Sequence, residues 1–287
     1  MVSDWSYTTN CEVPEDCQLP DSISRVAMGI SYEGSQFSGW QYQDHSPSVQ
    51  EALEAAISAV ADEPIKTVCA GRTDTGVHGY GQVIHFDSKA VRSVRNWLLG
   101  VNTRLPADIS VNWVKPVSAQ FHARFRAVRR SYRYLISNTP ARTAICHNGL
   151  TWERMPLDEA LMDTAAQLLV GEHDFSSFRA AACGAHSPVR EIYSISVKRW
   201  GSLVWLDIVA NAFLHHMVRN IAGALLLIGR GEQDTDWIAQ LLVARDRSIA
   251  APTALPNGLY LTDVEYPAEF DIPKVADPLL GLLDGLS

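Results

Sequence analysis

A glycine-rich loop at residues 70–81, AGRTDTGVHGYG, contains an aspartate that could carry chemistry. Its four glycines indicate unusual backbone dihedral angles, which would hold the side chains of Arg72 and Asp74 in set directions. A carboxylate held in this way can act as a nucleophile, although Asp74 could also simply cap its own turn. The loop lacks the Gly-Lys-Ser/Thr sequence of a P-loop, which excludes phosphate binding of that kind.

A second group of reactive side chains opens a predicted helix at residues 213–228. The last eight residues of this helix are apolar on every side, so we expect it to be buried. Arg219 would then need a carboxylate partner, because an unpaired guanidinium is costly in an apolar setting. His215 and His216 suggest a metal site, but neighbours on a helix point about 100° apart and no H-E-x-x-H pattern is present. We therefore expect a structural role for the two histidines, and no metal.

Cations and aromatic rings are interleaved in residues 121–134, FHARFRAVRRSYRY. If residues 128–137 form a strand, Tyr132 lies on one face and its neighbours Arg129 and Arg133 lie on the other. Such a segment suits RNA, because cations bind phosphates and a ring stacks on an unpaired base, worth ~1–3 kcal/mol per base. A solvated basic strand with buried tyrosines is the alternative. The candidate RNA-contacting residues are Arg124, Arg126, Arg129, Arg130, Tyr132 and Arg133.

The charge of the chain is unevenly distributed. The 287 residues have a net charge of −8, but residues 1–24 and 263–287 each carry −5, which leaves +2 for the body between them. An anionic partner is therefore compatible with the composition. The five cysteines include no C-x-x-C pair, which argues against a disulfide framework or a zinc knuckle. No apolar stretch has the length of a membrane span and the first residues do not resemble a signal peptide, so we expect a cytoplasmic protein.

Apolar periodicity predicts the element order βαββαβ in each half of the chain. In the first half, strands are expected at residues 25–32, 65–70, 82–86 and 109–114, with helices from Ser48 to near Pro64 and at 91–99. In the second half, strands are expected at 128–137, 189–199, 203–210 and 259–266, with helices at 157–170, 213–228 and 237–244. Gly171 is the expected C-cap of the helix at 157–170.

This order predicts the α+β fold class, with two ferredoxin-like (split βαβ) modules that each place helices on one face of a sheet. We expect residues 1–24 to be an acidic N-terminal extension and residues 25–120 to be the module that carries the Asp74 loop. Residues 121–266 should form the second module, and residues 267–287 a C-terminal tail.

Six strings in the chain resemble the TruA family of tRNA pseudouridine synthases, in the family's order and across nearly all of residues 25–266. They are YEGSQFSGW at 32–40, CAGRTDTGVHGYG at 69–81, FHARF at 121–125, SYRY at 131–134, NAFLHHMVRN at 211–220 and GLYL at 258–261. The chain departs from the family pattern at Thr75, where alanine is common, and at Ser131, where a basic residue is common. The first change leaves the Asp74 position untouched, and the second could weaken a phosphate contact.

The resemblance implies a pseudouridine-synthase-like fold with a central antiparallel sheet and an active-site cleft between the modules. It implies a homodimer that converts uridine to pseudouridine in the anticodon stem-loop, at tRNA positions 38 to 40, without metal or cofactor. Asp74 matches the nucleophile, Arg219 its basic partner and Tyr132 the ring that stacks on the target base. Arg72 matches a residue that assists base flipping, and Leu259 an apolar residue that lines the pocket.

The chemistry of these residues agrees with that reaction. Rejoining uracil to ribose through C5 requires a nucleophile that holds one fragment while the base rotates, and the carboxylate of Asp74 can do this. An adjacent Arg219 would keep it ionised, while Tyr132 is a candidate both for stacking and for removing the C5 proton. Two other classes remain open at this stage: a non-catalytic RNA-binding protein, for which Asp74 would be incidental, and a hydrolase that uses its histidines and a metal.

Overall fold

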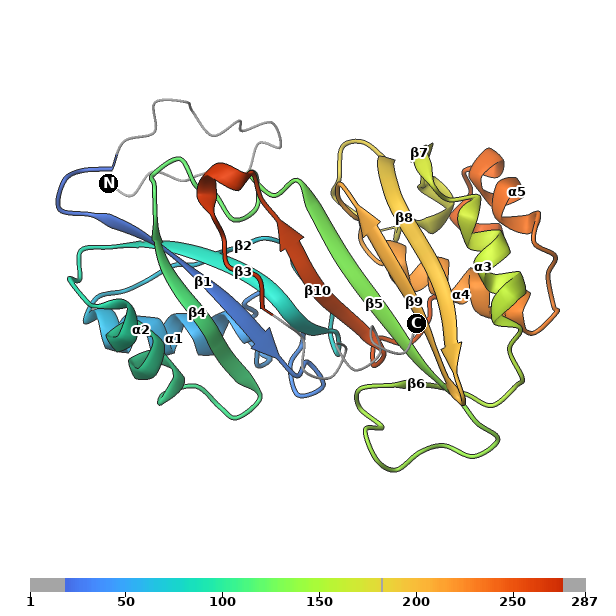
Figure 1. Ribbon diagram of the computed structural model, residues 1–287, viewed down its shortest axis with the longest axis horizontal. Helices are drawn as coiled ribbons and strands as arrows, with labels where there is room; N and C mark the ends of the chain where they lie inside the picture. Colours follow the sequence, from blue (N-terminus) through green and yellow to red (C-terminus); the bar gives the residue numbers. More distant parts are fainter. Residues whose placement is uncertain (1–18, 182, 276–287) are drawn as a thin grey trace.

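The computed structural model describes residues 19–181 and 183–275 and has a ten-stranded sheet with helices against it (Figure 1). The strands are β1 (Ser24–Tyr32), β2 (Val68–Cys69), β3 (His78–Ser88), β4 (Ile109–Val117), β5 (Arg129–Asn138), β6 (Thr151–Glu153), β7 (Gly171–Asp174), β8 (Val189–Trp200), β9 (Leu203–Ala210) and β10 (Leu259–Glu265). The helices are α1 (Val49–Ala61), α2 (Val94–Asn102), α3 (Glu159–Gln167), α4 (Met217–Gly229) and α5 (Trp237–Ala244), with short 3₁₀ turns at Ser176–Phe178, Arg247–Ile249 and Ala268–Phe270.

One continuous sheet joins the two halves of the chain. Its strand order is β4-β1-β3-β10-β5-β9-β8-β7, while β2 pairs with β3 and β6 pairs with β5. All these pairs are antiparallel except β10 with β3 and β5 with β6. The last strand, β10, therefore lies in the middle, bonded to β3 of the first half and to β5 of the second. The predicted α+β class with a central, mostly antiparallel sheet is confirmed.

Each half has its own apolar core between sheet and helices. In the first half, α1 and α2 cover the face of β1 and β4 (Figure 1), and buried Leu53, Ile57 and Trp97 pack against Met28 and Ile30. The α1 helix begins where predicted, because the side chain of its N-cap accepts a hydrogen bond from the third residue of the first turn. In the second half, α3, α4 and α5 lie beside β8 and β9 (Figure 1).

The helix expected at residues 213–228 begins four residues later, so its predicted start was wrong. His216 precedes α4 in the left-handed conformation, with φ at 62°. The backbone of His215 bonds to a neighbouring loop: its carbonyl accepts from Ala180 N at 3.0 Å, and its N–H donates to Cys183 Sγ at 3.4 Å. Because the N–H and carbonyl of His215 bond to this loop, they are not available for helical hydrogen bonds, and the helix starts only after them.

Smaller differences from expectation involve short or irregular segments. The α3 helix is capped by Leu168, whereas Gly171, with φ at 103°, starts β7. Strands β6 and β7 were not expected, because three or four residues are too few to show a period of two. Strand β3 starts at His78, inside the segment interpreted as loop, because glycines there masked its pattern.

The residues after β10 pack back onto the end of β4 and the segment that follows it. The Phe270 ring lies 5.3 Å from the Phe121 ring, and Lys115 Nζ lies 2.6 Å from Asp271 Oδ2. The start of the expected tail at 267–287 is thus part of the folded body. Its remaining residues 276–287, and residues 1–18 of the expected N-terminal extension, lie outside the described part of the chain. Within the described residues, no helix has the length and apolar character needed to cross a membrane.

Candidate active site

The loop that carries Asp74 connects β2 to β3 and is fixed by the segment after β1. The Trp40 N–H donates to the Thr73 carbonyl at 3.0 Å. Gly39 passes so close that a Cβ there would lie 2.7 Å from the Thr73 carbonyl oxygen, and its φ of 89° also favours glycine. The Tyr32 hydroxyl bonds to Thr73 Oγ1 at 2.8 Å. The segments at 32–40 and 69–81 therefore pack against each other, and the first holds the backbone of the second in place.

The other side of the same loop bonds to β3 and to the turn before β10. The Gln82 side chain donates to the Gly71 carbonyl at 2.7 Å, and its oxygen accepts from the Gly71 N–H at 3.4 Å. Gly76, with φ at 76°, packs on Pro256, where a Cβ would lie 3.0 Å from the proline ring. The backbone around Asp74 is thus held from three directions.

Arg219 in the first turn of α4 binds the carboxylate of Asp74. Its Nη1 lies 3.1 Å from Asp74 Oδ2, and its Nε donates to the Ala254 carbonyl at 2.9 Å. The Ala254 N–H in turn donates to the Arg219 carbonyl at 3.1 Å. The side chains of Arg219 and Asp74 are 14% and 22% exposed, so this pair is partly shielded from water. The predicted carboxylate partner of Arg219 is confirmed, and the pair brings the two halves of the chain together.

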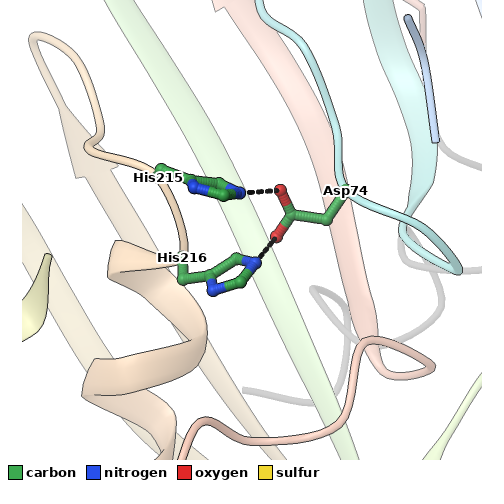
Figure 2. A group of neighbouring side chains, drawn as sticks. All are labelled: Asp74, His215 and His216. Carbon is green, nitrogen blue, oxygen red and sulfur yellow. Dashed lines mark ion pairs between the residues drawn. The ribbon is translucent and has the colours of Figure 1, made fainter. Parts of the chain in front are cut away.

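His215 and His216 also face Asp74 (Figure 2). His215 Nε2 lies 3.5 Å from Asp74 Oδ1, and His216 Nε2 lies 3.4 Å from Asp74 Oδ2. The expectation that the two imidazoles diverge was wrong, because it assumed a helix, whereas the left-handed φ of His216 brings the ring centroids to 4.0 Å. Among the described residues, this is the one group of three or more side chains whose ligand atoms lie close enough to hold a metal ion, all within 4.8 Å.

The protonation state of His216 follows from its surroundings. Burial lowers the pKa of His216 from its usual value, the negative charge of Asp74 opposes this, and the electrostatic interactions with His215 and with the positive charge of Arg219 add to the lowering. The His216 imidazole is therefore neutral near neutral pH.

Tyr132 on β5 lies beside the Asp74 loop. It is buried, its ring meets the Phe213 ring edge-on at 4.9 Å, and a Cβ built on Gly71 would lie 3.9 Å from its hydroxyl oxygen. Burial raises the pKa of the Tyr132 phenol, and the charge of Asp74 raises it further. A phenol of this kind stays neutral near neutral pH, which favours stacking over proton removal. Leu259 is buried at the start of β10, beside β5.

Two of the predicted RNA-contacting arginines bind other parts of the protein. Arg130 donates to four backbone carbonyls, two of them Ala70 at 3.2 Å and Asn211 at 2.9 Å. Arg133 is buried and pairs with Asp207 at 2.5 Å. Arg130 therefore fastens the Asp74 loop to β5 and β9, and neither guanidinium is arranged for a phosphate.

The remaining predicted cations are more accessible. Arg72 is exposed on the Asp74 loop, and Arg124 is exposed with its guanidinium 5.6 Å from the centre of the Phe125 ring. Arg129 is exposed over the Tyr193 ring at 4.5 Å, and the half-buried Arg126 donates to the Gln120 carbonyl at 3.3 Å. The structure therefore brings together Asp74, Arg219, Tyr132 and Arg72. The accessible cations Arg124, Arg126 and Arg129 lie in the segment that leads into β5 and at the start of that strand.

Sequence reasoning missed that His215 and His216 contact Asp74. The one available signal was that they lie close in sequence to Arg219, which was expected to reach a carboxylate; helical spacing gave no signal, because both histidines precede α4. The contacts of Gln82 and Ala254 were also missed, and neither residue has a sequence pattern that could reveal them.

Known proteins resemble this chain over most of its length. A family model described as tRNA pseudouridine synthase matches residues 28–126 and 165–267. A tRNA pseudouridine synthase A from Shewanella piezotolerans is 56% identical over 260 residues, which cover 91% of this chain and 100% of that protein. One from Cronobacter sakazakii is 53% identical over 256 residues, covering 89% and 95%. Among solved structures, the archaeal box H/ACA sRNP Nop10-Cbf5 complex is a weak likeness, with 13% identity, a TM-score of 0.35, and coverage of 82% of this chain and 47% of that one.

Proposed function

The chain belongs to the tRNA pseudouridine synthase family, as its six strings predicted, and from this premise we propose that its target uridines lie in the anticodon stem-loop, at tRNA positions 38 to 40, with Asp74 as the nucleophile. The enzyme is an isomerase that converts uridine in tRNA to pseudouridine. The observation that supports the proposal best is the contact between Asp74 and Arg219, 3.1 Å apart where the two halves meet. A surface that only binds RNA has no need of a carboxylate held in this way.

Asp74 has the properties that a nucleophile in this reaction needs. The bond between C1′ of the ribose and N1 of uracil breaks, the base turns, C1′ bonds to C5, the proton on C5 is lost to solvent, and N1 takes up a proton, so the product is an isomer of uridine. A carboxylate can hold one fragment through this sequence by attacking either C1′ or C6. Arg219 holds the carboxylate in place through the contact at 3.1 Å, and partial burial limits competition from water.

Tyr132 receives the flipped base. Flipping a uridine out of a stacked stem-loop costs a few kcal/mol, and stacking of the base on an aromatic ring offsets ~1–3 kcal/mol of that cost. Its ring lies next to the loop of Asp74 and is steadied by Phe213, so it can position uracil beside the carboxylate. Leu259 supplies an apolar wall near it, and Arg72 on the same loop is placed to assist flipping.

The accessible cations Arg124, Arg126 and Arg129 supply phosphate contacts around the position of the flipped base.

We propose that the enzyme needs neither metal nor cofactor for turnover, that it works in the cytoplasm and that it is a homodimer. The dimer rests on the family resemblance, and light scattering of the purified protein at micromolar concentration tests it.

The decisive experiment is the release of tritium from C5-labelled uridine in an unmodified tRNA transcript. We expect release with the wild-type protein, none with Asp74→Asn, and none from a transcript whose positions 38 to 40 carry no uridine. Full release from that transcript would refute the anticodon assignment, while multiple turnover by the Asn variant would refute the role of Asp74.

A further inference from the structure

We propose that Asp74, His215 and His216 form a binding site for a divalent transition-metal ion of the zinc type, and that the bound ion inhibits the enzyme by occupying its nucleophile. The metal-binding part stands on geometry alone. The inhibitory part rests on the proposed function of Asp74.

The three ligand atoms are already close to a metal-binding arrangement. In a tetrahedral zinc site with bonds of 2.0–2.1 Å, neighbouring ligand atoms lie about 3.3 Å apart. His215 Nε2 lies 3.5 Å from Asp74 Oδ1, His216 Nε2 lies 3.4 Å from the other oxygen, Oδ2, and one ligand atom from each residue lies within 4.8 Å of the other two (Figure 2). Small rotations of the imidazoles suffice to direct the three groups at one ion, and water can complete the shell.

The backbone holds the two imidazoles on the same side. His216 is fixed in the left-handed conformation at the N-terminus of α4. His215 is held through its backbone by Ala180 and Cys183. Both rings are partly exposed, with side-chain exposures of 41% for His215 and 29% for His216, so an ion can reach them from solvent.

Arg219 does not prevent binding, because it can support the carboxylate from outside the metal shell. It bonds Asp74 at Oδ2, which leaves Oδ1 for the ion, and metal-binding carboxylates are usually hydrogen-bonded in turn. Its positive charge nevertheless repels a cation. We therefore expect weaker affinity than at structural zinc sites with three or four protein ligands and no adjacent cation.

The donor set determines which ions bind. Two imidazoles and one carboxylate suit zinc, cobalt, nickel and copper, whereas magnesium and calcium prefer oxygen ligands. The magnesium that tRNA requires should therefore not compete. An ion held at this point would bridge Asp74 to the histidines and block its attack on the nucleotide.

The test uses the intact enzyme after chelator treatment and Co²⁺ as a spectroscopic probe. Titration with Co²⁺ should produce the visible bands of a protein-bound ion, Zn²⁺ should remove them, and millimolar Mg²⁺ should not. His215→Ala and His216→Ala should each weaken Co²⁺ binding by about tenfold or more, and the double variant should abolish it. His147→Ala and Cys146→Ser, which remove an exposed histidine and an exposed thiol from another loop, are the controls and should bind Co²⁺ normally.

A second arm measures tritium release with increasing Zn²⁺ at constant Mg²⁺, each variant compared with its own zinc-free rate. Zinc should inhibit the wild type, excess chelator should restore the rate, and the histidine variants that retain activity should need about tenfold more zinc. Absence of cobalt bands, or unchanged binding in the double histidine variant, would overturn the site while leaving the role of Asp74 intact. Binding without inhibition would overturn the inhibitory part and count against Asp74 as the nucleophile.

Discussion

Arg219 Nη1 lies 3.1 Å from Asp74 Oδ2, although the two residues are 145 positions apart and come from different halves of the chain. The contact ties the start of α4 to the loop between β2 and β3. It therefore stabilises the fold and orients the carboxylate at the same time.

Arg219→Ala should lower both stability and turnover. The variant leaves Asp74 without its hydrogen-bonded cation, and a partly shielded pair of this kind is worth about 1.5–3 kcal/mol in the free energy of unfolding. The matched control is Lys274→Ala, whose exposed pair with Asp263 should contribute at most about 1 kcal/mol. Denaturant unfolding measures both. Combined with Asp74→Asn, Arg219→Ala should destabilise less than the sum of the single changes. Strict additivity would mean that the two side chains do not interact.

Asp74→Asn should abolish tritium release and leave tRNA affinity within a few-fold, because it removes the proposed nucleophile and hardly changes the volume. Filter binding measures the affinity. The control is Asp246→Asn on an exposed 3₁₀ turn, which should retain wild-type turnover. A large loss of affinity in the Asp74 variant would indicate a role in binding instead.

The elements that sequence predicted well are those with long periodic patterns. The α1 helix and β9, for example, were expected within a few residues of their bounds, because each buries one regular face. The place of β10 between β3 and β5 was not predictable, since pairing between strands distant in sequence leaves no local pattern. The start of α4 was not predictable for the same reason. The His215 carbonyl accepts a hydrogen bond from Ala180 N outside the helix, and only the tertiary structure reveals this contact.

The candidate site divides in the same way. The apolar helix predicted that Arg219 needs a carboxylate partner, and the resemblance to the family identified Asp74 as that partner. Arg130 and Arg133 were expected on an RNA surface, because the sequence of a cationic segment is the same whether its side chains bind phosphates or backbone carbonyls. The structure places Arg130 on four backbone oxygens and Arg133 on Asp207, a distinction that depends on what folds against them.

Arg124→Ala should weaken tRNA binding and make it less dependent on salt. If Arg124 binds a phosphate as proposed, its removal should reduce the slope of log K against log salt by ~0.7–0.9. Arg133→Ala should leave the slope unchanged and instead lower the melting temperature, since its guanidinium pairs with Asp207. Binding titrations at four or more salt concentrations separate the two effects. An equal change of slope in both variants would mean that the pair with Asp207 opens to bind RNA.

Addition of EDTA should not lower the rate of pseudouridine formation, because the proposed chemistry requires no ion. The assay holds tRNA folding constant by restoring free Mg²⁺ after the chelator is added. If traces of zinc are present in the preparation, the rate should rise. A loss of activity that zinc restores would show instead that the group of Asp74, His215 and His216 is a catalytic metal site.

The enzyme should lose stability as the pH falls below about 6.5, in part because of two histidines between the modules. Burial lowers the pKa of His85 from 6.5 to about 2 and that of His122 to about 4. Both are neutral in the folded protein, where His85 Nδ1 accepts the Ala123 N–H at 3.1 Å and His122 Nδ1 accepts the Phe125 N–H at 3.1 Å. Folded pKa values below the unfolded one mean that the unfolded chain binds protons first as the pH falls.

Their contribution is therefore complete above about pH 6.5 and declines below it, by about 1.4 kcal/mol per pH unit for each histidine once the pH is well below 6.5 and still above the folded pKa. His85→Gln should be less stable than the wild type at pH 7, and this difference should shrink toward pH 4.5, because glutamine does not titrate. His147→Gln, an exposed histidine in another loop, should follow the wild type at every pH. Melting temperatures from pH 7.5 to 4.5 measure the effect. A constant difference between His85→Gln and the wild type over that range would contradict a lowered pKa of His85 in the folded protein.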